Sequence, residues 1–303
     1  DPIEVDMGVL PRIDWRCFPD GFPNIMINSV GDLVDKDVVF LASFDSPADI
    51  FTQLGVIYAL PRYRVNSLKV FLPYFPTGTM ERVKREGEIA TAKTLARMLS
   101  DIPLTKSGPA EIFIFDIHSL AERFYFGDGV IPCLESAIPS LLYFLKQHEL
   151  FLTNGGETPL AIAFPDKGAW ERFGEKFLST GWEIICCNKE RSGKERKVTV
   201  VEGDPRGKHV IIVDDLIMTG HTQIACKEAI LKVGGAEVIV VSAYATHGVF
   251  PEQSYVVEMA KAGFSSIWIT DSCPKTAEAV IKHKSFEILS LDTSISALIK
   301  KRR

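Results

Sequence analysis

Val-Ile-Ile-Val-Asp-Asp-Leu-Ile-Met-Thr-Gly-His-Thr occupies residues 210–222 and is the most informative stretch of the chain. Its leading apolar β-formers predict a buried strand, the acidic pair ends that strand, and a short loop leads into a helix. Apolar residues at positions 226, 229, 230 and 233 have the i, i+3, i+4, i+7 spacing that predicts this helix. This order is typical of open α/β sheets, which bind ligands at the carboxyl ends of their strands.

The loop between the predicted strand and helix favours a phosphate site. Backbone N–H groups and the positive end of the helix dipole meet there, beside the hydroxyls of Thr219 and Thr222. Ionised Asp214 and Asp215 can accept hydrogen bonds from the neighbouring hydroxyls of a sugar. Two acids can also simply begin a solvated loop, but the loop and helix that follow favour binding. Phosphate and diol together indicate a ribose phosphate.

Short apolar runs alternate with helical stretches along the whole chain. The expected strands are 38–44, 68–74, 112–116, 160–164, 184–187, 210–213, 238–242 and 266–269, and the expected helices are 47–60, 88–99, 135–147, 169–179, 222–233 and 251–262. This alternation predicts an α/β fold with mainly parallel sheets flanked by helices. The Gly-rich stretch 153–158 divides it into two similar domains, 1–152 and 153–303. We expect 294–303 to be a solvated tail whose last residues can pack back on the N-terminal domain.

Composition excludes several classes of protein. The formal net charge of −5 argues against a nucleic-acid-binding protein, and no apolar run is long enough to span a membrane. The six cysteines have no CxxC spacing, so we expect reduced core thiols, neither zinc ligands nor disulfides. Without a signal-like start, the chain is expected to be cytoplasmic. There is no GxGxxG, and residues 203–209 are one residue short of the P-loop pattern and lack its Ser/Thr.

At the 210–222 loop the chain resembles the phosphoribosyl diphosphate binding motif shared by phosphoribosyltransferases and ribose-phosphate diphosphokinases. Further matches follow the order of the second family over nearly the whole chain. They are Phe18-Pro19-Asp20-Gly21, Pro73-Tyr74, Arg85-Glu86, Thr91-Ala92-Lys93, Asp116-Ile117-His118, Pro165-Asp166-Lys167-Gly168 and Lys189-Glu190-Arg191. A phosphoribosyltransferase would not supply the N-terminal matches. The chain is therefore identified as similar to the ribose-phosphate diphosphokinases.

The resemblance implies an enzyme of nucleotide biosynthesis. It would move the diphosphoryl group of ATP onto the C1 hydroxyl of ribose 5-phosphate, giving phosphoribosyl diphosphate and AMP. It implies two similar domains of the type I phosphoribosyltransferase kind, with Mg²⁺ as cofactor and ATP as co-substrate. It also implies a homo-oligomer in which neighbouring subunits complete the adenine site.

The resemblance assigns roles to individual residues. The expected ATP contacts are Phe18, Asp20, Phe22, Arg82 and His118, the metal ligands Asp116, His118 and Asp166, the catalytic cations Lys189 and Arg191, and the ribose 5-phosphate contacts Asp214, Asp215, Thr219, Gly220, His221 and Thr222. Period two along a strand would point Asp116 and His118 to the same face. Asp166 can also cap the following helix. We expect residues 189–197 to be a mobile loop that closes over substrate.

Departures from the family pattern leave alternatives open. Thr79-Met80-Glu81 stands where the family has Arg-Gln-Asp, Phe22 replaces a glutamate, and the ribose loop carries Met218 and His221. These differences resemble the phosphate-independent, plant-type class II branch, which tolerates other nucleotide donors. A non-catalytic regulatory paralogue and a type I phosphoribosyltransferase remain alternatives. Phe18 and Phe22 can also plug a hairpin core, and Arg82 can belong to a solvated loop.

Overall fold

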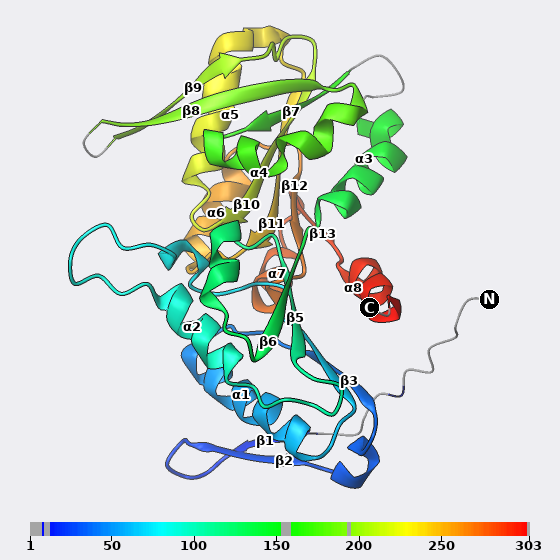
Figure 1. Ribbon diagram of the computed structural model, residues 1–303. Helices are drawn as coiled ribbons and strands as arrows, with labels where there is room; N and C mark the ends of the chain where they lie inside the picture. Colours follow the sequence, from blue (N-terminus) through cyan, green and yellow to red (C-terminus); the bar gives the residue numbers. More distant parts are fainter. Residues whose placement is uncertain (1–7, 9–12, 153–158, 193–194, 302–303) are drawn as a thin grey trace. The chain divides into compact units, whose positions relative to one another are not determined.

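The computed structural model describes residue 8 and residues 13–152, 159–192 and 195–301, without the side chains of 149–152, 190–192 and 195–197. The chain forms two compact units. Unit 1 comprises Asp1–Glu135 and Asp292–Arg303, and unit 2 comprises Ser136–Leu291. Each unit has its own mainly parallel sheet, as Figure 1 shows. Each also has its own buried hydrophobic clusters.

Unit 1 is built on a four-stranded parallel sheet with the order β3-β4-β5-β6. An antiparallel hairpin, β1–β2, precedes this sheet in the chain. The elements are β1 (Ile13–Cys17), β2 (Pro23–Ile27), η1 (Val30–Leu33), β3 (Asp37–Leu41), α1 (Pro47–Arg62), β4 (Ser67–Phe71), η2 (Gly78–Met80), α2 (Thr91–Ser100), β5 (Ala110–Phe115), η3 (Leu120–Tyr125), β6 (Val130–Glu135) and α8 (Asp292–Lys300).

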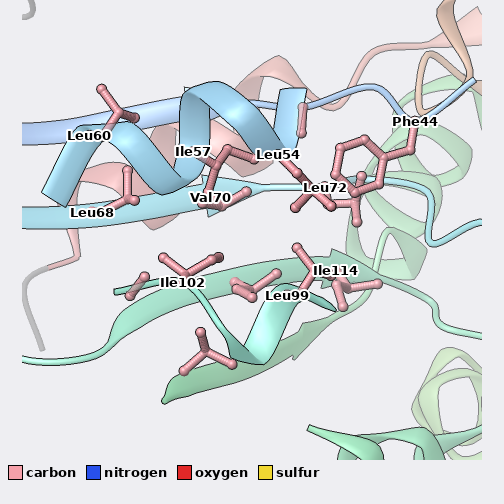
Figure 2. Close-up of a cluster of buried hydrophobic side chains, with 14 of the residues drawn as sticks. Phe44, Leu54, Ile57, Leu60, Leu68, Val70, Leu72, Leu99, Ile102 and Ile114 are labelled. Atoms are coloured by element: carbon pink, nitrogen blue, oxygen red, sulfur yellow. The ribbon is translucent and has the colours of Figure 1, made fainter. Parts of the chain in front are cut away.

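Helix α1 covers one face of this sheet. Its first turn is fixed by the Ser46 side chain, which accepts a hydrogen bond from the Asp49 N–H at 3.2 Å. Figure 2 shows Ile57 of α1 beside Val70 of β4, and Leu68 shares the face of Val70 because side chains alternate along a strand. All three side chains are buried, so an Ile57→Ala change would cost about 2–5 kcal/mol of folding free energy.

The other face of β4 holds helix α8. Phe71 stacks on Phe113 of β5, with ring centroids 4.5 Å apart. Beside them the Lys69 ammonium donates to the carbonyls of Leu298 at 3.3 Å and of Lys301 at 3.2 Å. A cation at a helix C-terminus satisfies carbonyls that have no partner within the helix. The segment expected as a solvated tail is therefore largely a helix that belongs to unit 1.

Unit 2 is built on a seven-stranded sheet with the order β13-β12-β11-β10-β7-β8-β9. All neighbouring strands are parallel except β8 and β9, which form an antiparallel hairpin. The elements are α3 (Ile138–Leu152), β7 (Leu160–Phe164), α4 (Lys167–Phe177), η4 (Leu178–Thr180), β8 (Glu183–Ser192), β9 (Glu195–Glu202), β10 (His209–Ile217), α5 (His221–Gly234), η5 (Gly235–Glu237), β11 (Val240–Gly248), α6 (Gln253–Lys261), β12 (Ile267–Thr270), α7 (Pro274–Val280) and β13 (Phe286–Leu289).

Strand β10 separates two helical layers. Ile211 and Val213 pack in the core cluster that contains residues of α3 and α4. Val210 and Ile212 pack in the cluster that contains residues of α5 and α6. Period-two alternation thus gives each layer every second side chain of β10.

The α/β class is confirmed, but several local expectations change. The Gly-rich stretch 153–158 lies outside the described residues, and the units divide at Glu135/Ser136, before α3. The reason is that α3 packs its buried residues against β7 of unit 2. The run 189–197 was expected to be a mobile loop; apart from 193–194, it lies in the strands β8 and β9. All six cysteines are free thiols, but Cys17 is exposed and not part of a core.

Candidate functional site

The loop that leads from β10 into α5 is held on both of its sides. At its start, the Ile217 carbonyl accepts a hydrogen bond from the Val249 N–H at 2.9 Å, which ties it to the end of β11. At its end, Gly220 adopts φ +80°, a conformation that suits glycine. A Cβ on Gly220 would lie 2.8 Å from the Met259 sulfur of α6, so the loop packs against that helix. Helix α5 then begins at His221.

The two carboxylates at the end of β10 have partners on two different helices. Asp214 faces α5, where Gln223 donates from Nε2 to Asp214 Oδ2 at 2.9 Å. Asp215 faces α4, where Arg172 Nη1 lies 3.6 Å from Asp215 Oδ2. Burial raises the pKa of Asp214, and the negative charges of Asp215 and Asp166 raise it further. One acid is therefore held by an amide and the other by a guanidinium.

Strand β8 and helix α5 are joined by two side-chain contacts. Lys189 Nζ donates to Thr222 Oγ1 at 3.0 Å, which places this predicted catalytic cation beside a predicted ribose 5-phosphate contact. Deeper in the core, the sulfurs of Cys187 and Cys226 lie 3.6 Å apart. The side chain of Arg191, the other predicted catalytic cation, lies outside the described residues.

Asp166 lies at the end of β7, the strand next to β10. Its Oδ1 accepts a hydrogen bond from the Ala169 N–H at 3.0 Å, so the predicted helix cap is confirmed. Its charge also contributes to the raised pKa of Asp214. Because the carboxyl ends of parallel strands meet at one edge of a sheet, Asp166 and Asp214 lie at the same edge.

His221 reaches from the loop to helix α6. Its Nε2 lies 3.4 Å from Glu258 Oε1, and its ring meets the Tyr255 ring edge-on with centroids 6.0 Å apart. Both partners of the His221–Glu258 pair are about half exposed, so solvent weakens their attraction. Thr219 is partly buried, and Gly220 is buried. Unit 2 thus brings all of the predicted ribose 5-phosphate contacts into one loop and the adjoining strand and helix ends.

In unit 1, Asp116 and His118 follow strand β5 without continuing it. The strand ends at Phe115, and Asp116 adopts φ +36°, a left-handed conformation that is strained for a side chain with a Cβ. Asp116 is buried and His118 is exposed, so the expectation that they share one strand face is wrong. Across from them, an ideal Cβ on Gly78 would lie 3.5 Å from His118 Cβ. The loop after β4 therefore packs on the loop after β5.

The remaining predicted ATP contacts lie at two places in unit 1. Arg82 is 73% exposed and pairs through Nε with Glu81 Oε1 at 2.9 Å, close to η2. Phe18, Asp20 and Phe22 form the turn of the β1–β2 hairpin, where Asp20 Oδ1 accepts from the Phe22 N–H at 3.1 Å. Phe18 is 51% and Phe22 65% exposed, which contradicts the alternative that they plug a hairpin core.

Arg172 is the residue that motif reading missed. It lies within α4, one position before the buried Phe173, and matches none of the motifs used above. A cation six residues after Asp166 on the helix that Asp166 caps was the available signal.

In the described part of the chain no helix combines the length and the apolar character that a membrane crossing requires.

Comparison with known proteins agrees with this geometry. The family model of the phosphoribosyl transferase domain matches residues 183–276, which include β10, its loop and α5. A crystal structure of phosphoribosylpyrophosphate synthetase from Mycobacterium smegmatis has the same fold, with a TM-score of 0.78 over 98% of this chain and 91% of that one, at 22% identity.

Two plant relatives are much closer in sequence. Ribose-phosphate pyrophosphokinase 3, chloroplastic, from Oryza sativa subsp. japonica is 48% identical over 96% of this chain and 70% of its own length. Ribose-phosphate pyrophosphokinase 4 from Arabidopsis thaliana is 46% identical over 97% of this chain and 85% of its own length. At this identity and coverage, the chain belongs to the ribose-phosphate pyrophosphokinase family, as its motifs indicated.

Proposed function

We propose that this enzyme transfers the β,γ-diphosphoryl group of ATP to the C1 hydroxyl of ribose 5-phosphate, giving phosphoribosyl diphosphate and AMP for nucleotide biosynthesis. The observation that carries this proposal is the loop at 214–222, where two anchored carboxylates adjoin a glycine-containing helix start. The relatives' names, ribose-phosphate pyrophosphokinase, describe this same reaction.

On the acceptor side, the loop separates two tasks. The N–H groups at the start of α5 and the hydroxyl of Thr219 would bind the 5-phosphate. Asp214 and Asp215 would accept hydrogen bonds from the ribose hydroxyls and so fix the orientation of C1. His221 would add a donor at the phosphate, held there by its contacts with Glu258 and Tyr255 of α6.

On the donor side, the chemistry requires cations and a nucleobase contact. The C1 oxygen attacks the β-phosphorus while the bond to the α-phosphate oxygen breaks and AMP leaves, so negative charge must be stabilised throughout. Lys189 and Arg191 would stabilise the negative charge on the transferring diphosphoryl group, and Arg82 and His118 would contact the triphosphate. Phe18 and Phe22 would stack on the base, with Asp20 accepting from an exocyclic amine.

The residues present fit Mg²⁺ bound mainly through substrate phosphates. Among the described residues, no three His, Cys, Asp or Glu side chains cluster as a metal site, but Mg²⁺ commonly uses one or two carboxylates plus phosphate oxygens. Asp116 would offer such oxygens to one ion and Asp166 to a second ion near the acceptor, whereas the nitrogen of His118 suits this cation less well. When bound, each ion would neutralise phosphate charge, and Asp166 would keep its cap on α4.

Three finer properties belong to this proposal. We expect activity without added phosphate, as in the plant-type branch, because the loop departs from the common pattern at Met218 and His221. We expect a homo-oligomer, because the exposed Phe18 and Phe22 would complete the nucleotide site of a neighbouring copy. We expect the protein in the cytoplasm, whereas one relative is named as chloroplastic and another as mitochondrial.

The test is a direct assay of both products. The protein is incubated with ribose 5-phosphate, ATP and magnesium in phosphate-free buffer, and phosphorus NMR follows AMP and phosphoribosyl diphosphate. Equal amounts of the two products are expected. Turnover only after phosphate is added would overturn the branch assignment and keep the reaction. No turnover with phosphate or with other nucleotides would overturn the proposal and favour the regulatory paralogue.

A further inference from the structure

Arg172 places a largely buried guanidinium against the acidic pair of the ribose loop. Its Nη1 lies 3.6 Å from Asp215 Oδ2, and the side chains of Arg172 and Asp215 keep only 14% and 12% of their exposure. Its guanidinium carbon lies 5.1 Å from the centre of the neighbouring Phe173 ring. Nη1 itself has no hydrogen-bond partner among the described residues, so it approaches the carboxylate at slightly more than hydrogen-bond length.

The fold explains why this cation lies here. Helix α4 packs in the same core cluster as Ile211 and Val213 of β10, which brings Arg172 to the end of that strand. The buried amide of Gln223, on α5, fixes Asp214 through a bond of 2.9 Å. Arg172, on α4, is the cation that the structure pairs with Asp215. The two carboxylates therefore have partners on two different helices.

We infer that Arg172 is a positioning residue of the ribose site, which holds the Asp215 carboxylate ready for the hydroxyls of ribose 5-phosphate. The inference rests on the proposed function, because it assumes that this loop binds a ribose phosphate. Arg172 attracts the largely buried carboxylate of Asp215, so losing this cation would leave the orientation of that carboxylate less well fixed. Asp215 would then be less often oriented to accept from the hydroxyls of the sugar.

The same contact predicts which kinetic constant changes. Arg172 and its partner belong to unit 2, and α4 packs in the core of that unit. Loss of the cation should therefore weaken ribose 5-phosphate binding and leave the Michaelis constant for ATP as it is. A general loss of folding would lower the active fraction without changing either Michaelis constant. The two explanations thus predict different kinetics.

The experiment compares Arg172→Gln and Arg172→Lys with Lys176→Gln, an exposed cation on the same helix. For Arg172→Gln we expect the KM for ribose 5-phosphate to rise about tenfold or more, with the KM for ATP unchanged. A tenfold change corresponds to about 1.4 kcal/mol. Arg172→Lys should recover part of the loss, because it restores the charge, and Lys176→Gln should behave as wild type. Equal changes in both Michaelis constants would overturn the inference.

A double-mutant cycle covers the case in which Arg172→Gln does not fold. Asp215→Asn is compared with Arg172→Gln/Asp215→Asn, in which no charge is left unpaired. If Arg172 acts through Asp215, the double variant should bind ribose 5-phosphate as Asp215→Asn does; a further tenfold loss would contradict it. Ribose 5-phosphate binding is also measured by calorimetry, so the cycle remains decisive even if the wild-type protein forms no phosphoribosyl diphosphate and the proposed reaction fails.

Discussion

Replacing Gly220 by alanine tests whether the ribose loop is packed as described. Two independent penalties are expected at this position. The first is conformational, because φ is +80° there, and a left-handed residue with a Cβ costs roughly 1–2 kcal/mol. The second is steric, because the new Cβ would lie 2.8 Å from the sulfur of Met259, whose side chain is fully buried. Inserting one methyl group into a packed core typically costs about 1–3 kcal/mol.

Gly207 separates the two penalties. It also has a positive φ, +69°, but no atom would lie within 4 Å of an added Cβ. Gly207→Ala should therefore show only the conformational loss of roughly 1–2 kcal/mol, and Gly220→Ala the sum, about 2–5 kcal/mol. Adding Met259→Ala to Gly220→Ala removes the atom in the way. Met259→Ala also removes buried side-chain volume and is destabilising by itself. The informative quantity is therefore the coupling free energy between the two substitutions.

Urea unfolding followed by tryptophan fluorescence measures these differences, since Trp170, Trp182 and Trp268 all belong to unit 2. If Gly220→Ala is no less stable than Gly207→Ala, the close packing of the loop on Met259 is wrong. The same variants are then assayed with ribose 5-phosphate. A loop displaced by the methyl group should raise the KM for this substrate, whereas Gly207→Ala should leave it unchanged.

Three further predictions concern other residues of the site. Thr222→Val removes the hydroxyl that accepts from Lys189, so it should raise the KM for ribose 5-phosphate about fivefold to tenfold in steady-state kinetics. Thr222→Ser keeps the hydroxyl and should remain near wild type. An unchanged KM in Thr222→Val would show that this contact does not contribute to substrate binding. Phe18→Ala should change the unfolding free energy by less than about 0.5 kcal/mol, because the ring is exposed, yet raise the KM for ATP roughly twofold to tenfold; equal KM values would exclude stacking. Folding raises the pKa of Asp214, so ionising this acid costs more in the folded chain than in the unfolded chain. The protonated acid therefore contributes stability at low pH, and this contribution is lost as the pH rises through the pKa of the folded state. Asp214→Asn should therefore gain stability relative to wild type between acid and neutral pH in urea unfolding, and parallel pH profiles would refute this.

Much of the fold could be predicted because its signals are local. Residues 210–213 are apolar β-formers followed by acids, and the structure has a strand there whose alternate side chains enter two different cores. The β8–β9 hairpin was not predicted, because the charged residues at its tip have the composition of a solvated loop. Helix α8 was not predicted either, because its place depends on Lys69, more than two hundred residues earlier in the chain. Such distant partners leave no periodic pattern in the sequence.

The site was partly predictable for the same reason. The ribose loop is one continuous segment, so its spacing indicated both the helix start and the acids. The expectation for Asp116 and His118 assumed that β5 continues, whereas the chain turns into a left-handed conformation at Asp116. Strain of this kind persists only where surrounding structure imposes it, and it concentrates at functional positions. A sequence motif can identify such a residue, but the conformational propensity of its residue type does not predict its backbone conformation.

Arg172 shows what motifs and periodicity do not supply. The helix capped by Asp166 buries Ala169, Phe173 and Phe177, and at about 100° per residue Arg172 lies to one side of that buried face. Helical spacing alone therefore does not select Arg172 as a partner of the sheet. Its pairing with Asp215 depends on α4 packing beside β10, and the two residues are more than forty positions apart in the chain. The pair is thus a tertiary contact, which is why the sequence motifs did not reveal it.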